Sequence, residues 1–300
     1  MPLELAPHLV APRLRGGLRL CGWETTARHL RAETVLWIND PMIGRHCLRR
    51  GLRAVYDVTD DWRTARLVDA DRAALVAAED ELARAVTTVV CSGVLRDRWV
   101  ERYAVAPPVI HNGVDTAAYA DATPTVIAGS GPRLLYIGTL HEDRLDVDLL
   151  GNLAAADIGE VHLVGPDRLS AGVRRQLEST GRVVVHGPVR HEDVPGWMVA
   201  ADVLICPHRV SDFTLSLDAI KSFEYLASGR PVVATPTSGF QDMTEHQGVE
   251  VVDRQEFIGV VAETLGRPRE RISRQATEHD WANRTQEFAE QLSRARRIGA

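Results

Sequence analysis

A single lysine, Lys221, stands among the 35 lysine and arginine residues of this 300-residue chain. It lies in the segment Asp218–Thr235, which reads DAIKSFEYLASGRPVVAT. The ammonium group of lysine acts as a compact point charge toward phosphate, whereas the arginine guanidinium is a planar fork. A helix over residues 217–228 would place Asp218, Lys221 and Glu224 on one face, because they are spaced three residues apart. This face predicts either a phosphate-binding site or a solvated row of ion pairs.

The elements that must position this face can be read from the same segment. The opposite side of the helix is an apolar stripe expected to face the core, made of Ile220, Phe223, Leu226 and Ala227. Gly229 is placed to end the helix, and Pro231 follows the stop. Residues 232–235 then predict a short buried strand. In an α/β fold, a charged helix face beside a parallel strand is a common place for a ligand site.

Composition bounds the function. The chain is 45% hydrophobic and 25% charged, as in ordinary soluble globular proteins, and its net charge of −6 argues against a nucleic-acid partner. It has no apolar run long enough to span a membrane, and its first residues lack a signal-peptide pattern. Its four cysteines lie far apart and indicate reduced thiols in a cytoplasmic protein, with neither disulfides nor a zinc site.

Alternating strands and helices predict two α/β domains. In the first half, we expect strands at 34–38, 54–58, 87–91 and 108–111. A second series is expected at 133–137, 160–164, 182–186, 202–206, 231–235 and 249–252. Amphipathic helices between β-branched runs indicate parallel sheets covered on both faces, and right-handed crossovers make each domain Rossmann-like. We expect a shortened first domain at 1–120, a second at 130–265 and a charged helical tail at 268–300.

The linker and the amino terminus are less regular. Residues 120–132 are rich in Pro, Gly and other small residues, which suits a linker. Residues 1–33 carry a group of arginines with few acids, namely Arg13, Arg15, Arg19, Arg28 and Arg31. This group is interpreted as a solvated, partly helical face, with a membrane-surface or acceptor-facing patch as the alternative.

The segment from Asp218 to Thr235 resembles the donor-site motif K-x-x-E-Y-L-A-x-G-x-P-V-V of GT-B glycosyltransferases of the group 1 (family 4) type. Weaker matches to the same family fall at residues 35–41, 55–61, 79–92, 112–115 and 136–146. Together they cover about residues 34–245. The resemblance implies two Rossmann-like domains that face each other across a cleft, with the second holding a nucleotide-sugar.

Two departures from the family pattern stand out. Many relatives carry two glutamates with seven residues between them; Glu224 matches the second, but Ser216 occupies the first position. The family also opens with a strand, a glycine-rich loop and a helix on the acceptor side. No such unit is found here, and Gly16-Gly17 is a poor substitute because no convincing strand precedes it. The resemblance therefore implies a truncated amino-terminal domain.

For the donor, the resemblance implies a hexose-type unit carried on a nucleoside diphosphate such as UDP or GDP. Stabilising the departing diphosphate without a metal requires cations and backbone amides. The expected donor-binding residues are Gly138, Thr139, Arg144, Arg190, Ser216, Lys221 and Glu224. Lys221 and Arg144 supply the cations, Glu224 accepts from the ribose hydroxyls and Arg190 meets the base.

Each donor residue also has a plainer interpretation. Gly138 can be a tight turn only, Arg144 a solvent-exposed helix-start residue, and Ser216 a helix N-cap. Glu224 can serve as an ion-pair partner of Lys221 one helical turn away.

Asp60, Asp61 and His141 are the candidate catalytic residues. Asp60 and Asp61 follow a strand on the acceptor side, where one would deprotonate or orient the acceptor hydroxyl. His141 would polarise the phosphate or sugar. The alternatives are helix capping for the aspartates and a structural role for the histidine.

The resulting prediction is a cytoplasmic, metal-independent hexosyltransferase that uses a hydroxyl or amine acceptor. That acceptor is a glycan, a lipid-linked molecule or a small molecule. A non-catalytic partner subunit of the same fold, and a sugar-nucleotide epimerase or coupling enzyme, remain the alternatives. Peripheral membrane contact and homo-oligomer formation also stay open.

Overall fold

The computed structural model describes residues 34–64, 68–129, 131–216, 218, 220–267 and 276–297. The arginine group within residues 1–33, the Gly16-Gly17 pair and the first part of the predicted tail, residues 268–275, lie outside the described residues. Among the helices that are described, none combines the length and apolar character needed to cross a bilayer.

The first domain contains a small parallel sheet. Its order is β1-β2-β3, built from Val35–Ile38, Arg53–Val58 and Thr87–Val90. Its helices are α2 (Pro41–Arg49), α3 (Asp69–Ala85) and α4 (Gly93–Tyr103). The strand predicted at 108–111 is not formed and is reduced to a parallel bridge between Val90 and Val109. Pro107 and Pro108 explain this, because neither has an N–H to extend the ladder.

The second domain contains a parallel sheet of six strands in the order β6-β5-β4-β7-β8-β9. Its strands are β4 (Arg133–Ile137), β5 (Glu160–Val164), β6 (Val183–Gly187), β7 (Val203–Cys206), β8 (Val232–Ala234) and β9 (Val249–Val251). After β4, strands β5 and β6 extend the sheet on one side of it. The chain then crosses over, and β7, β8 and β9 extend the sheet on the other side. The carboxyl ends of β4 and β7 therefore meet where the strand order reverses, which is where open α/β sheets bind ligands.

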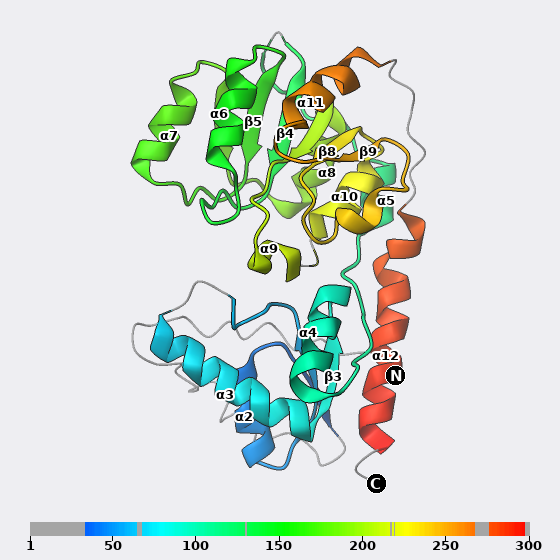
Figure 1. The fold of residues 1–300 in the computed structure, drawn as a ribbon. Coiled ribbons are helices and arrows are strands. Elements are labelled where there is room, and N and C mark those ends of the chain that lie inside the picture. Colours follow the sequence, from blue (N-terminus) through cyan, green and yellow to red (C-terminus); the bar gives the residue numbers. More distant parts are fainter. Residues whose placement is uncertain are drawn as a thin grey trace.

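Helices cover this sheet and reach toward the first domain. They are α5 (Thr116–Ala120), α6 (Val147–Ala155), α7 (Ala171–Glu178), α8 (Val194–Ala200), α9 (Asp212–Ser216), α10 (Ile220–Ser228) and α11 (Phe257–Gly266). The single helix predicted over 217–228 is wrong at its start: the chain forms α9 and then α10, with Asp218 between them. In Figure 1, α9 lies at the end of the second domain that faces the first.

The last helix, α12 (Trp281–Arg297), returns from the second domain to the first. Figure 1 shows it in red, running down beside the lower domain. Phe288 meets the ring of Trp37 on β1 edge to face, with the ring centroids 4.5 Å apart. The cluster around them also includes the buried Val55 and Val89 of the sheet. The predicted helical tail is thus part of the first domain's core.

Candidate functional site

Lys221 lies in the first turn of α10, with its side chain turned toward the carboxyl end of β4. Its Nζ donates to the Tyr136 hydroxyl at 2.9 Å and sits 4.1 Å from the centre of that ring. Among the described residues, no carboxylate forms an ion pair with it. Burial opposes its charge, but Tyr136 and the nearby Cys206 and Glu224 hold its pKa above the usual lysine value. The solvated row of ion pairs is therefore not formed.

Gly138 makes room for this ammonium. It follows β4 with φ 147°, and a Cβ built on it would lie 2.6 Å from the Lys221 Nζ. Gly165, which follows β5, allows the Gly138 turn to pack closely, because its own Cβ would fall 2.1 Å from the Gly138 carbonyl oxygen. An L side chain at position 138 would both strain the backbone and displace the cation. The lack of a side chain is thus what lets the charge reach the turn.

Arg144 provides a second cation near the first. Its guanidinium carbon lies 5.4 Å from the centre of the Phe213 ring in α9. Its charge acts on Asp60 of the first domain and on His208 of the second, which places it where the two domains face each other. Within the described part of the chain, no acid is ion-paired with it.

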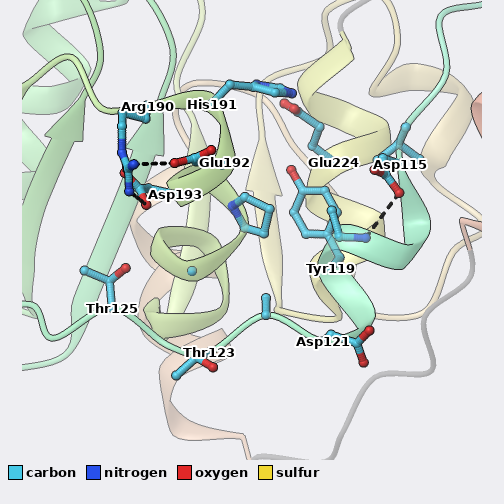
Figure 2. Close-up of a pocket in the computed structure, with 15 residues that line it drawn as sticks. Asp115, Tyr119, Asp121, Thr123, Thr125, Arg190, His191, Glu192, Asp193 and Glu224 are labelled. Carbon is cyan, nitrogen blue, oxygen red and sulfur yellow. Dashed lines mark hydrogen bonds and ion pairs between the residues drawn. The ribbon is translucent and has the colours of Figure 1, made fainter.

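A pocket of about 740 Å³ opens beside Glu224 (Figure 2). It is lined by α5, by the chain that follows it up to Thr125, and by residues 190–196. In Figure 2 the Glu224 carboxylate points toward His191 and the Tyr119 ring. Burial raises the pKa of Glu224, although Lys221, His191 and a hydrogen bond from Tyr119 oppose this. The pocket therefore combines an acceptor carboxylate with an aromatic wall, one helical turn from the Lys221 ammonium.

Arg190 lines the other side of the pocket, but its guanidinium is already paired with two acids of its own loop. Its guanidinium makes two hydrogen bonds of 2.9 Å to Asp193 and an ion pair with Glu192. The side chain is 72% exposed. The structure thus brings Arg190 and Glu224 to one pocket, with Arg190 placed at its rim.

Three other predicted residues have different surroundings. Ser216 is buried at the end of α9, its hydroxyl donates to the Phe213 carbonyl, and it does not cap α10 as an N-cap would. Thr139 is exposed next to Gly138. His141 is half exposed and pairs with Asp143 in its own loop.

Asp60 and Asp61 are adjacent but differ in their bonding. Asp61 has no exposed side-chain area, and its carboxylate accepts from Arg98 at 2.8 Å and Arg102 at 3.0 Å. Burial alone would raise its pKa, but these arginines lower it overall. Among the described residues, the Thr59 hydroxyl is the one group that donates a hydrogen bond to Asp60, at 3.3 Å. Burial raises the pKa of Asp60, with Thr59 and Arg144 opposing that rise.

One group of described residues has metal-ligand character: His246, Glu278 and His279, whose ligand atoms lie within 4.8 Å of one another. The guanidinium of Arg284 lies 3.0 Å from Nδ1 of His279. A guanidinium can only donate, so Nδ1 must accept and the ring proton sits on Nε2, the nitrogen that faces Glu278. Metal binding there would require losing the Arg284 bond, which disfavours the group as a metal centre.

Sequence reasoning missed Tyr136, His208, Tyr119 and His111. Tyr136 lies within a strand pattern, which predicts a core position for it. His208 follows β7, and its place at the carboxyl end of a central strand is the one signal that could have selected it. Tyr119 and His111 reach the site through contacts with Glu224 and Asp218, more than 100 residues away in sequence.

Comparisons with known proteins agree with this architecture. Residues 131–267 match the family model described as Glycosyl transferases group 1. The TuaH protein of Bacillus subtilis (strain 168), which carries the name of a teichuronic acid biosynthesis glycosyltransferase, is 26% identical over 234 residues. That match covers 71% of this chain, and the chain spans only 59% of the length of TuaH.

Solved structures resemble the whole arrangement. Anabaena HepE in complex with UDP superposes with a TM-score of 0.70 at 17% identity, over 91% of this chain and 81% of that one. Sucrose-phosphate synthase from Thermosynechococcus elongatus gives 0.72 at 19% identity, over 99% of this chain and 86% of that one. The chain therefore has the GT-B fold, and residues 131–267 of its second domain resemble the group 1 glycosyl transferases.

Proposed function

We propose that this protein is a glycosyltransferase that moves a sugar from a nucleoside diphosphate sugar to a hydroxyl or amine acceptor. The second domain holds the donor. The observation that carries the proposal is the Lys221 ammonium, buried at the Gly138 turn with no carboxylate ion-paired to it among the described residues. A buried charge without a counter-charge is costly, so a bound anion would supply the missing partner.

The geometry suggests how the donor lies. The diphosphate would rest between Lys221 and Arg144, with the Thr139 amide nearby, since the Gly138 and Leu140 amides already donate to backbone carbonyls. The nucleoside would extend into the pocket beside Glu224, whose carboxylate can accept from the ribose hydroxyls. Arg190 stands at the rim, where the base would enter. As the sugar leaves, negative charge builds on the diphosphate, and the two cations would stabilise it without a metal.

For the acceptor side, we propose Asp60 rather than Asp61. Asp61 is fully committed to Arg98 and Arg102, whereas Asp60 keeps free acceptor capacity and lies within the field of Arg144. A carboxylate whose pKa is raised by burial is also the better base. In an inverting reaction Asp60 would take the acceptor proton; in a retaining one it would orient the hydroxyl.

We further propose that the transferred unit is of the hexose type. One structural neighbour, Anabaena HepE, was solved in complex with UDP-glucose and in complex with UDP and glucose. The acceptor is a glycan, a lipid-linked molecule or a small molecule, and the protein works in the cytoplasm.

Calorimetry with UDP, GDP and UDP-glucose tests the donor site. Lys221→Met keeps the length of the side chain and removes its charge, and should weaken nucleoside diphosphate binding about 30- to 100-fold. The control is Arg267→Met, which removes a surface cation paired with Glu250 and should leave binding unchanged. Equal affinities for the Lys221→Met and unmodified proteins would refute the donor placement.

Turnover tests the reaction itself. With UDP- and GDP-sugars and a broad acceptor panel, the protein should consume donor only when an acceptor is present. Asp60→Asn should lower turnover about 100-fold while donor affinity stays the same. Donor binding without turnover for every acceptor would identify a nucleotide-sugar-binding partner subunit instead of an enzyme.

A further inference from the structure

Tyr136 is the residue that determines where the Lys221 ammonium lies. It is on β4, one residue before the strand ends, and only 1% of its surface is exposed. Its hydroxyl is 2.9 Å from the Lys221 Nζ, and its ring lies 4.1 Å below the same nitrogen. The charge is therefore held by both a hydrogen bond and the face of the ring.

The hydrogen bonds around this hydroxyl run in one direction. An ammonium can only donate, so the Tyr136 oxygen accepts from Lys221 and must send its own proton elsewhere. His208 Nε2 lies 3.0 Å away and can accept it, while the Thr139 carbonyl is farther, at 3.4 Å. Burial, with the charges of Lys221 and Arg144, keeps the pKa of His208 well below its usual value, so this ring is neutral.

The rest of the ammonium is left facing the turn. On the side of Gly138 no side chain intervenes, and Tyr136 is the one described hydrogen-bond partner of the Nζ. Two N–H groups thus remain for another acceptor. A flexible lysine side chain normally samples many rotamers, and fixing it in one of them costs conformational entropy.

We propose that Tyr136 is a positioning residue for Lys221: its ring and hydroxyl, oriented by His208, hold the ammonium at the Gly138 turn before the diphosphate arrives. This inference rests on the proposed function, because it names the anion as the diphosphate of the donor. It differs from a core role for Tyr136 in one respect. Losing only the hydroxyl should weaken recognition of the diphosphate and leave recognition of the nucleoside intact.

The binding test compares UDP with uridine. Tyr136→Phe keeps the ring and removes the hydroxyl, so UDP affinity should fall about 5-fold while uridine affinity changes less than about 2-fold. In the Lys221→Met background the same substitution should have no effect on UDP, because the group that Tyr136 positions is gone. Additive losses in the double variant would overturn the proposal.

Tyr225 provides a matched control in the same core. It is completely buried, and its hydroxyl donates to the Ile205 carbonyl at 3.2 Å and accepts from the Ile137 N–H at 3.4 Å. Among the described residues, no hydrogen bond joins it to Lys221. Tyr225→Phe should lower stability by a similar amount yet leave the UDP-to-uridine affinity ratio unchanged. If Tyr136→Phe fails to fold, the Tyr136→Phe/Lys221→Met double variant removes both partners and should recover folding.

A second readout does not depend on any ligand, because Lys221 is the only lysine. Protein grown with [¹³Cε]-lysine should give a single Cε signal, shifted by the Tyr136 ring. In Tyr136→Phe this signal should titrate at a lower pH, since a hydrogen bond that favours the charged amine is lost. Tyr136, Cys206, Glu224, Arg144 and His208 are the titratable and charged groups around it, and only the first changes.

The two readouts separate the two ideas. An unchanged Cε signal and titration midpoint in Tyr136→Phe would overturn the positioning role whatever the protein binds. A shifted signal, with no UDP, GDP or UDP-glucose binding to the unmodified protein, would keep the positioning role and refute the proposed donor.

Discussion

Asp60 and Asp61 illustrate how two like side chains acquire different roles. Both end the same strand–turn segment, yet Arg98 and Arg102 of α4 reach only Asp61. The charge of Asp61 is thereby compensated and unavailable for proton transfer at neutral pH. Asp60 keeps a single weak donor and a raised pKa, with burial as the main cause.

Asp61→Asn should therefore lower the free energy of unfolding by about 3 kcal/mol, because it removes the counter-charge of Arg102 and leaves Arg98 with the exposed Asp212 at 4.0 Å. Asp61 has a lowered pKa when folded, so its contribution is fully present above the unfolded value and is lost as pH falls through the folded pKa. Urea unfolding at several pH values measures this.

The stability difference between Asp61→Asn and the unmodified protein should be constant near neutral pH and shrink below about pH 4. Asp60→Asn is the control and should change stability by less than about 0.5 kcal/mol. A large loss in Asp60→Asn, with none in Asp61→Asn, would reverse the assignment of the two aspartates.

At the scale of the secondary-structure elements, the turn after β4 is the one that connects the end of a central strand to the proposed donor site. A methyl group on Gly138 would lie 2.6 Å from the Lys221 Nζ and 3.2 Å from the Tyr136 hydroxyl. The backbone φ of 147° adds strain for any other residue.

Gly138→Ala should therefore abolish UDP binding and lower the melting temperature. Gly151→Ala is its counterpart: Gly151 lies within α6, nothing approaches its missing Cβ within 4 Å, and alanine there should stabilise by about 0.5–1 kcal/mol. Calorimetry and thermal melts of both variants check this. Full UDP affinity in Gly138→Ala would mean that the diphosphate does not use this turn.

Helix α12 packs against the sheet of the first domain. Phe288 completes a cluster with Trp37, and the facing side of the sheet contributes Val55 and Val89. Within the described residues, the sheet of the first domain has three strands, and this helix supplies apolar contacts that such a small sheet would otherwise lack.

In the molecule as a whole, Asp218 joins the two domains directly before α10. Its carboxylate accepts a hydrogen bond from the Asn112 backbone N–H at 2.5 Å and lies 3.0 Å from Nδ1 of His111. Both residues belong to the segment that leaves the first domain. Ser92 adds a bond of 2.9 Å to the Ser216 carbonyl. Asp218 precedes Lys221 by three residues, so this contact between the domains lies just before the first turn of α10.

The stability that the contact between His111 and Asp218 provides should depend on pH. The hydrogen bond to Asp218 is the main cause of a raised His111 pKa, against burial and the charge of Arg284, with a smaller contribution from Asp242. A raised pKa means that the stabilisation is present below the unfolded value and is lost as pH rises through the folded value.

His111→Gln should therefore lower the melting temperature at about pH 5.5 more than at about pH 9. Its UDP affinity should vary less with pH than that of the unmodified protein. A melting-temperature difference that stays equal across this range would show that protonation of His111 does not contribute to stability.

Much of the fold follows from local pattern. The β-branched runs predict nine strands within two residues of their observed ends, because a buried parallel strand needs apolar residues on both faces. The end of α10 at Ser228, directly before Gly229, follows in the same way. The three-residue spacing of Lys221 and Glu224 likewise predicts that both lie on one side of a helix, and both lie in α10.

The sequence alone thus determined most of the helices and strands, the GT-B resemblance and the choice of Lys221 as a candidate binding residue. Only the tertiary structure decided that Asp218 leaves the helix to bind His111, that Ile220 is 45% exposed instead of core, and that Lys221 turns inward to Tyr136. Local pattern reports the period of an element, whereas the partner of a charge depends on residues about 100 positions away that only folding brings together.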